Sequence, residues 1–220
     1  MPIELAAFDM DGTLIDVDSS WAEVHRHFGD SNPEALKLFL TDQIDDREFI
    51  RRDVQIWWKH APTLTVQEVD RILASVPLMP GAARLFEGLR ARGIHTAIVS
   101  GGIDLLAQRL GRQLGIERVF ANGLVSDASG RLTGEGVVRV PIKGKGRVLA
   151  ALQQELGIPR ERTASVGNSE IDVDLFRQSR LGVAFLPADE AVRAGATHVV
   201  TRRDLGELLP ILLEADGGSG

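Results

Sequence analysis

The chain has 220 residues, 44% of them hydrophobic and 25% charged, a composition typical of globular proteins that bury an apolar core. Its 25 Lys and Arg against 31 Asp and Glu give a net charge of −6, which argues against nucleic acid or an anionic membrane as a partner. The absence of cysteine excludes disulfides, thiolate metal sites and a cysteine nucleophile. Because no apolar run resembles a signal peptide or a membrane span, we expect a cytoplasmic location.

The first predicted element is a short apolar strand at residues 3–8, which ends at the polar segment 9–13. From about 15 to 77 the pattern changes, because helix-capping residues and a proline suited to a first helical turn replace strand-like runs. Four helices are predicted there, one up to residue 28, one from 33, and two at 46–60 and 65–74. We interpret this segment as a helical-bundle cap inserted into the rest of the chain.

From residue 80 onward, predicted strands and helices alternate. Strands are predicted at 95–99, 119–121, 163–166, 182–186 and 198–200, helices at 82–92, 103–114, 145–156 and 171–178, and a hairpin turn at 127–130. Repeated strand–helix units predict an α/β fold, a Rossmann-like parallel sheet with helices on both faces. The expected catalytic core comprises 1–14 and 78–220, the cap comprises 15–77, and the tail at 216–220 is expected to be disordered.

Polar residues follow three of the predicted strands, at 9–13, 100–102 and 167–172, and Lys145 opens a helix before the third. In open parallel sheets, ligands bind beyond the carboxyl ends of the strands, so these residues are expected to lie together. Carboxylates and an amide suit Mg²⁺, which prefers oxygen ligands, while hydroxyls, a lysine and glycine N–H groups suit a phosphate. Together with a further carboxylate as nucleophile, these groups are the ones that phosphoryl transfer through an aspartyl-phosphate requires.

On these motifs the sequence resembles the haloacid dehalogenase superfamily, and within it the phosphoserine phosphatase group. The shared features are an apolar strand followed by Asp-x-Asp-Gly-Thr, a helical cap, Ser-Gly-Gly, a lysine, and a glycine with an aspartate five residues later. The likeness covers nearly the whole chain and is weakest in the cap. It implies a Mg²⁺-dependent phosphatase that acts on a small phosphorylated metabolite, with phosphoserine as the first choice.

The resemblance also implies roles for individual residues. Asp9 would attack phosphorus, and Asp11 would protonate the leaving oxygen and then deprotonate the attacking water. Ser100, the amide of Gly101 and Lys145 would hold the phosphoryl oxygens. In addition, Thr13 would help to position the phosphate loop.

The implied metal ligands are Asp9, the main-chain carbonyl of Asp11, Asn168 and Asp172, the last two completing or orienting the metal shell. Asn168 departs from the family, which has an aspartate after the glycine. An amide oxygen can bind Mg²⁺ but brings no charge, so metal affinity would be lower or Asp172 would bind directly. We expect Mg²⁺-dependent activity to persist.

Substrate selection is expected from the cap. Asp18 has the family's spacing for an acidic residue that meets the substrate amine, and Arg51 or Arg52 resembles the arginine that binds the carboxylate. Taken without the family, Asp18 is a helix cap and the two arginines are surface residues of a helix.

Several alternatives stay open at this point. A dehalogenase or phosphonate-cleaving enzyme of the same superfamily would not need the acid at Asp11. A phosphotransferase, or a phosphatase for another small phosphometabolite, fits the same motifs. A catalytically silent phosphate-binding protein is supported only by Asn168, which by itself also suits a helix cap. No nucleic-acid or membrane partner is expected, and the protein is expected to be a monomer or a homodimer.

Overall fold

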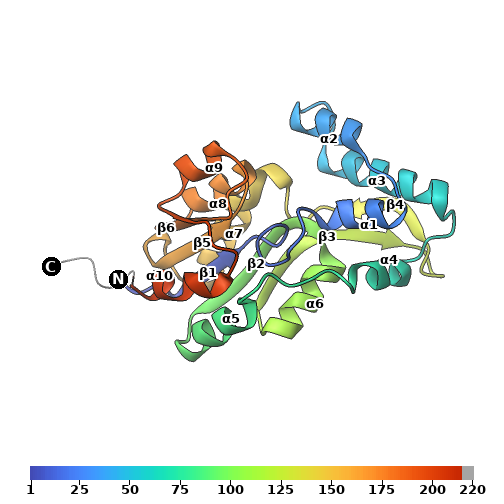
Figure 1. The fold of residues 1–220 in the computed structure, drawn as a ribbon. Coiled ribbons are helices and arrows are strands. Elements are labelled where there is room, and N and C mark those ends of the chain that lie inside the picture. Colours follow the sequence, from blue (N-terminus) through green and yellow to red (C-terminus); the bar gives the residue numbers. More distant parts are fainter. Residues whose placement is uncertain (215–220) are drawn as a thin grey trace.

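The computed structural model describes residues 1–214, and this part of the chain contains a seven-stranded sheet with the order β4-β3-β2-β1-β5-β6-β7 (Figure 1). The strands are β1 (Leu5–Phe8), β2 (His95–Ile103), β3 (Arg118–Ser126), β4 (Leu132–Val137), β5 (Thr163–Gly167), β6 (Leu181–Phe185) and β7 (His198–Val200). Neighbouring strands are parallel, except that β3 and β4 form an antiparallel hairpin. The predicted α/β sheet is therefore confirmed, with an antiparallel edge added. The tail predicted to be disordered, 216–220, lies outside the described residues.

Strand β1 occupies the centre of the parallel part of the sheet. Leu5 is in register with His95 of β2 on one side and with Thr163 of β5 on the other. Because the chain continues to one side of β1 and later to the opposite side, the order of strands reverses at β1. The carboxyl end of such a strand is where doubly wound sheets form their ligand crevice, and Asp9 is the first residue after it.

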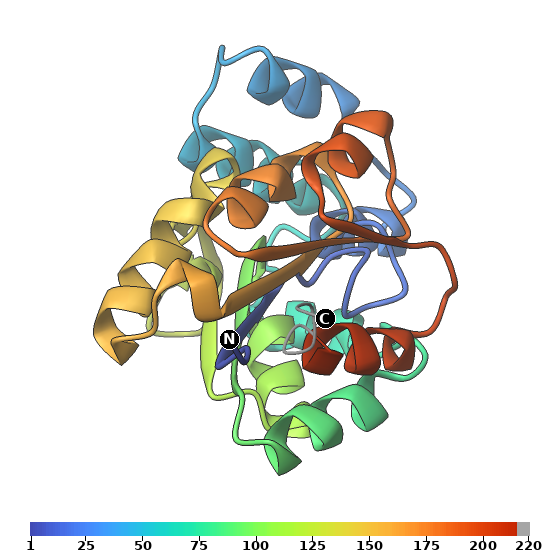
Figure 2. The same cartoon turned by 90° about the vertical axis from the view of Figure 1, so that its left-hand side faces the viewer.

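Side chains that alternate along β1 enter two separate apolar cores. Ala6 and Phe8 contribute to one core, and Leu5 and Ala7 to the other. The face of Phe8 is covered by α5 (Ala82–Ala91), α6 (Asp104–Leu114) and α10 (Leu208–Glu214). The opposite face is covered by α7 (Lys145–Leu156), α8 (Val173–Arg177) and α9 (Glu190–Gly195). The sheet lies between these two helical layers (Figure 2).

The helix predicted at 171–178 differs from the prediction at its start. It begins as a 3₁₀ turn, η3 (Glu170–Asp172), and becomes α-helical only in α8. The Asp172 side chain accepts hydrogen bonds from the loop before it, which keeps this turn tight. The other 3₁₀ turns are η1 (Ile142–Gly144), η2 (Arg160–Arg162) and η4 (Leu205–Glu207).

Four helices separate β1 from α5: α1 (Ser20–His27), α2 (Pro33–Leu40), α3 (Asp46–His60) and α4 (Val66–Leu73). Each begins where a polar side chain accepts a hydrogen bond from a first-turn backbone N–H. The capping residues are Ser19, Asn32, Asp45 and Thr65. The predicted positions of these helices are confirmed, and within residues 1–214 every helix is too short or too polar to cross a lipid bilayer.

The chain leaves the sheet layer and returns to it at one place. Ile15 and Leu78 form an antiparallel bridge, supported by backbone hydrogen bonds from the Met79 N–H to the Leu14 carbonyl and from the Asp16 N–H to the Pro77 carbonyl. Helix α3 packs against β4 of the β3–β4 hairpin, and α2 lies on the far side of α3 (Figure 1). Trp57 of α3 shares the apolar core of the Phe8 face. These contacts support the division into a core of 1–14 and 78–220 and a cap of 15–77, which we keep as a proposal.

Candidate active site

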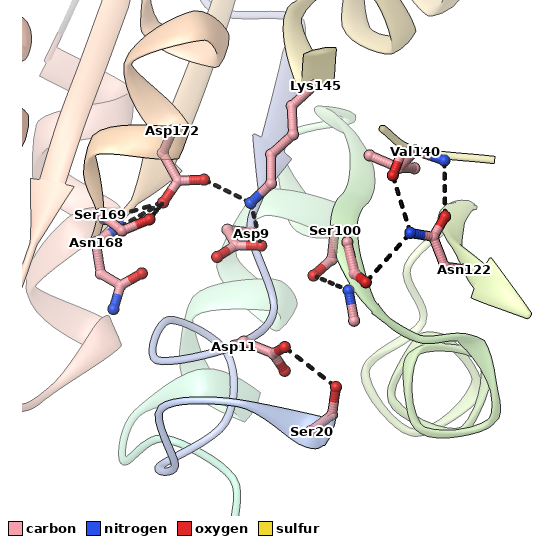
Figure 3. Close-up of polar contacts among 12 residues, drawn as sticks. Asp9, Asp11, Ser20, Ser100, Asn122, Val140, Lys145, Asn168, Ser169 and Asp172 are labelled. Carbon is pink, nitrogen blue, oxygen red and sulfur yellow. Dashed lines mark hydrogen bonds and ion pairs between the residues drawn. The ribbon is translucent and has the colours of Figure 1, made fainter. Parts of the chain in front are cut away.

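One buried lysine stands between two buried carboxylates at the carboxyl end of β1. The Lys145 Nζ atom lies 2.7 Å from Asp9 Oδ1 and 2.6 Å from Asp172 Oδ1 (Figure 3). Lys145 is the first residue of α7, and Asp172 is the last residue of η3, so residues far apart in the sequence meet here. The site predicted from the three polar strand ends is thus brought together by the switch point of the sheet.

Burial and mutual repulsion control the charges of this cluster. Burial raises the pKa of Asp9, and the charge of Asp172 raises it further, while Lys145 opposes both effects. For Lys145, burial alone would lower the pKa, but the carboxylates of Asp172 and Asp9 hold it above its usual value. Lys145 therefore keeps its positive charge at neutral pH, where it can offset negative charge beside Asp9.

Asp172 uses both carboxylate oxygens inside the protein. Its Oδ1 accepts from Lys145, while its Oδ2 accepts from the backbone N–H of Asn168 at 2.9 Å and from the backbone N–H of Ser169 at 3.1 Å. The Ser169 hydroxyl donates to the same oxygen. Asp172 consequently orients Lys145 and the loop after β5, while its direct binding to a metal stays a prediction.

Asp11 has one engaged and one free oxygen. Its Oδ2 accepts a hydrogen bond from the Ser20 hydroxyl at 3.1 Å, whereas its buried Oδ1 has no hydrogen-bond partner among residues 1–214. Burial, followed by repulsion from Asp9, raises the pKa of Asp11 to about 7. A carboxyl group with this pKa can donate a proton and later accept one at neutral pH, which suits general acid–base catalysis.

The predicted phosphate-binding residues Ser100 and Gly101 lie within β2, which extends four residues beyond the predicted strand. The buried Ser100 hydroxyl accepts from the backbone N–H of Gly102 at 3.2 Å. The carbonyl of Gly101 is held by two donors, the indole N–H of Trp21 at 3.0 Å and the side-chain amide of Asn122 at 3.3 Å. The anchoring contact of Trp21 was not predicted from the sequence, because nothing in the local pattern of α1 indicates a partner eighty residues away.

Thr13 lies in the loop after β1, and Asn168 lies in the loop after β5. Thr13 is fully buried in the turn after Asp11, and its hydroxyl oxygen has no hydrogen-bond partner among residues 1–214. The side-chain amide of Asn168 lies against Gly12, where a Cβ atom would collide with it. Gly12 also has a positive φ of 71°, so both its backbone conformation and this close approach favour glycine.

The oxygen atoms of Asp9, Asp11 and Asn168 are of the kind that binds a hard divalent cation. No group of three or more His, Asp or Glu side chains within residues 1–214 is arranged to hold a metal, so a metal would need a main-chain carbonyl and a neutral amide as well. Asp9, Asp11 and Asn168 supply such a set around the first loop (Figure 3). The free buried oxygen of Asp11 and the raised pKa values of Asp9 and Asp11 mark a site that lacks positive charge.

The predicted substrate-binding residues are not joined to this cluster. Asp18 is exposed, and Arg51 forms ion pairs with Glu48 of its own helix and with Glu135 of β4 at 3.0 Å. Arg52 pairs with Glu48 at 2.9 Å. Within residues 1–214, no hydrogen bond or ion pair connects these three side chains to Asp9, Asp11 or Lys145, and their assignment stays a prediction.

Comparisons with known proteins agree with this geometry. The family model of haloacid dehalogenase-like hydrolases matches residues 6–177. The phosphoserine phosphatase of Methanocaldococcus jannaschii is 28% identical over 94% of this chain and 96% of its own length, and that of Idiomarina loihiensis is 30% identical over 96% and 94%. A solved structure described as a phospho-aspartyl intermediate analogue of phosphoserine phosphatase superposes with a TM-score of 0.81 at 26% identity, covering 96% of this chain and 99% of that one.

Proposed function

Because the chain belongs to the haloacid dehalogenase-like hydrolases, we propose that it is a phosphatase that hydrolyses phosphoserine through an aspartyl-phosphate formed on Asp9. The observation that carries the proposal is the buried contact of Lys145 with Asp9, with Asp11 two residues further along the same loop. Two relatives that cover nearly the whole chain are phosphoserine phosphatases, which supports this substrate over other small phosphomonoesters.

In the first half of the reaction, an oxygen of Asp9 forms a bond to phosphorus as the bond to the serine oxygen breaks. Lys145 offsets the charge that develops on the phosphoryl oxygens, and Ser100 with the amide of Gly101 binds these oxygens. Asp11, in its protonated form, transfers its proton to the leaving serine oxygen. The products of this half are serine and a phosphorylated Asp9.

In the second half, water replaces serine. Asp11, now a carboxylate, takes a proton from the water as the water oxygen attacks phosphorus and the bond to Asp9 breaks. The pKa of Asp11, about 7, allows the same group to act first as an acid and then as a base. Phosphate leaves, and Asp9 and Asp11 return to their starting states.

We propose Mg²⁺ as the cofactor, held by the Asp9 carboxylate, the main-chain carbonyl of Asp11 and the amide oxygen of Asn168. When bound, the ion would supply positive charge for the phosphoryl oxygens and for Asp9. Asp172 would support this arrangement from outside, because it already orients Lys145 and the backbone of Asn168.

The substrate amine and carboxylate would be recognised by the cap. We propose that Asp18 meets the amine and that Arg51 or Arg52 meets the carboxylate. Arg51 forms partly exposed ion pairs with Glu48 and Glu135, so this role would require Arg51 to exchange those partners for the substrate. A cytoplasmic location and a monomeric or homodimeric state remain predictions.

The test is a release assay for inorganic phosphate with purified protein, Mg²⁺ and a panel of phosphorylated metabolites that includes phosphoserine. Asp9→Asn serves as the blank, since an amide is a poor nucleophile toward phosphorus. Phosphoserine should be hydrolysed with the highest kcat/KM of the panel, and acid quenching should trap phosphate on the protein but not on Asp9→Asn. Higher kcat/KM for another metabolite would refute the substrate, and activity of Asp9→Asn would refute the nucleophile.

A further inference from the structure

Ser20 joins Asp11 to the phosphate-binding segment. Its hydroxyl donates to Asp11 Oδ2 at 3.1 Å (Figure 3). Its oxygen also accepts from the backbone N–H of Ile103 at 3.0 Å. Ser20 is fully buried. Since the Ile103 N–H is necessarily the donor in its contact, the single hydroxyl hydrogen of Ser20 is left for Asp11.

The space for this contact depends on Gly102. A Cβ atom at Gly102 would lie 2.7 Å from Ser20 Oγ, 2.8 Å from Asp11 Oδ2 and 2.5 Å from the methyl carbon of Met10. The first helix of the cap, the loop after β1 and the end of β2 therefore meet at one point. The hydrogen bond between Ser20 and Asp11 is therefore enclosed by three separate elements and does not involve an exposed hydroxyl.

The two oxygens of Asp11 are consequently not equivalent. Oδ2 accepts the Ser20 hydrogen, whereas the buried Oδ1 has no hydrogen-bond partner among residues 1–214. A proton on Oδ2 would have to be donated to the Ser20 oxygen, and the Ser20 hydrogen would then lose Asp11 as its acceptor. The acid form of Asp11 is therefore favoured with its proton on Oδ1.

We infer that Ser20 is a positioning residue for Asp11, which makes Oδ1 the oxygen that transfers the proton. The inference rests on the proposed function. In the first half-reaction the Oδ1–H bond breaks and an O–H bond forms on the leaving alcohol, and in the second half a water O–H bond breaks and the Oδ1–H bond forms again. Without the Ser20 hydroxyl, either oxygen can carry the proton and the carboxyl group can rotate.

The experiment compares two substrates that differ in their need for an acid. The serine alkoxide leaves only with a proton, whereas nitrophenolate leaves without one. In the Ser20→Ala variant, kcat/KM for phosphoserine should fall on the order of tenfold, part of the full effect of a general acid. The kcat/KM for p-nitrophenyl phosphate should stay about the same, because this ratio reports only the steps up to release of the leaving group.

Ser19→Ala is the matched control, since Ser19 caps the same helix by accepting from the backbone N–H of Ala22 and does not touch Asp11. It should leave the ratio of the two kcat/KM values unchanged. Ser20→Cys fills the same space with a weak donor and should give a smaller fall in the same direction, which keeps the test available if Ser20→Ala is poorly folded.

Equal losses with both substrates would show a structural role only, and a faster Ser20→Ala would show that Ser20 holds Asp11 in an unreactive orientation. Either result, or no change, overturns the inference. A wild-type protein without activity on phosphoserine or any other alkyl phosphate would instead refute the proposed function itself.

Discussion

The Lys145 ammonium and the Asp172 carboxylate form an ion pair of 2.6 Å between side chains that are 5% and 0% exposed. The same ammonium lies 2.7 Å from Asp9, so one cation compensates two almost completely buried carboxylates. We therefore expect Lys145 to stabilise the folded protein, in addition to its proposed role in binding phosphate.

Replacing Lys145 with methionine should destabilise the protein strongly. Asp9 and Asp172 would remain buried without a cation, which costs about 3–5 kcal/mol in comparable pairs. Urea denaturation at neutral pH measures the free energy of unfolding. Lys143→Met is the control, because Lys143 pairs with Asp42 at the surface and should cost about 0–1 kcal/mol. A similar small cost for Lys145→Met would contradict the compensating role, and adding Asp172→Asn should restore part of the loss.

Asp11 should make stability depend on pH. Its pKa rises from 3.8 to about 7 on folding, so between these values the folded state binds more protons than the unfolded state. The contribution of Asp11 to stability is therefore largest in acid and is lost as the pH rises toward 7. Asp11→Asn removes this dependence, and the variant should gain up to about 4 kcal/mol relative to the wild type between acidic and weakly alkaline pH.

This dependence is measured by urea denaturation across the pH range in buffer containing EDTA, so that metal binding does not compensate the carboxylate. Asp9 is present in both proteins, so its own burial cancels in the difference, and what remains is the contribution of Asp11 together with its repulsion from Asp9. A difference between Asp11→Asn and the wild type that stays constant with pH would disprove the raised pKa.

Asn168→Asp should strengthen metal binding. The substitution restores a charge where the family has aspartate, and ligand charge is a main determinant of affinity at sites of oxygen donors. Isothermal titration with Mg²⁺ should give a dissociation constant on the order of tenfold lower than that of the wild type. Without Mg²⁺ the variant should be less stable, because the added carboxylate would stand near Asp9 and Asp11. An unchanged dissociation constant would remove residue 168 from the metal site.

Asp18→Ala should change substrate recognition without changing the chemistry. If Asp18 meets the substrate amine, KM for phosphoserine should rise on the order of tenfold, the range for loss of a charged hydrogen bond. KM for p-nitrophenyl phosphate, which has no amine, should stay the same. Glu34→Ala, a loss of another exposed carboxylate of the cap, provides the comparison. Equal effects of Asp18→Ala on both substrates would exclude Asp18 from recognition.

Gly102→Ala should impair both folding and catalysis. The added methyl group would overlap Ser20, Asp11 and Met10, and overpacking of this kind costs about 1–3 kcal/mol. Gly93→Ala is the control for backbone strain without overpacking. Gly93 has a φ of 67°, but no atom lies within 4 Å of the place that its added methyl group would take. Thermal unfolding should report losses for both, but phosphatase activity should fall only for Gly102→Ala. Full activity of Gly102→Ala would show that the three-element contact can adapt.

Much of the fold was predictable because its signals are local. Capping residues, closing glycines and short apolar runs indicated the helices and the strands, and the polar ends of three strands indicated a shared site. The resemblance to the haloacid dehalogenase superfamily, built on the same residues, is confirmed by the family match. The length of β2 was underestimated, because Ser100 to Gly102 resembled a turn although these residues continue as strand.

Details that depend on distant partners were not predictable. Nothing in the sequence around Ser20 indicates that its hydroxyl meets Asp11 and the backbone of Ile103, because these contacts form only when the cap packs on β2. In the same way, Arg51 forms an ion pair with Glu135, which lies 84 positions later in the sequence. The sequence of α3 alone could not predict this partner. Local periodicity specifies which face of a helix is buried, but not which side chain it meets.

The bridge between Ile15 and Leu78 places the entry and the exit of the cap on adjacent backbones. A segment that begins and ends at neighbouring points can be exchanged for another of different length without altering the order of strands in the sheet. An insertion at this junction would thus change the surroundings of the site while Asp9 and Asp11 stay in place. Because Trp57 shares the apolar core of the Phe8 face, a transplanted segment would also have to cover that surface.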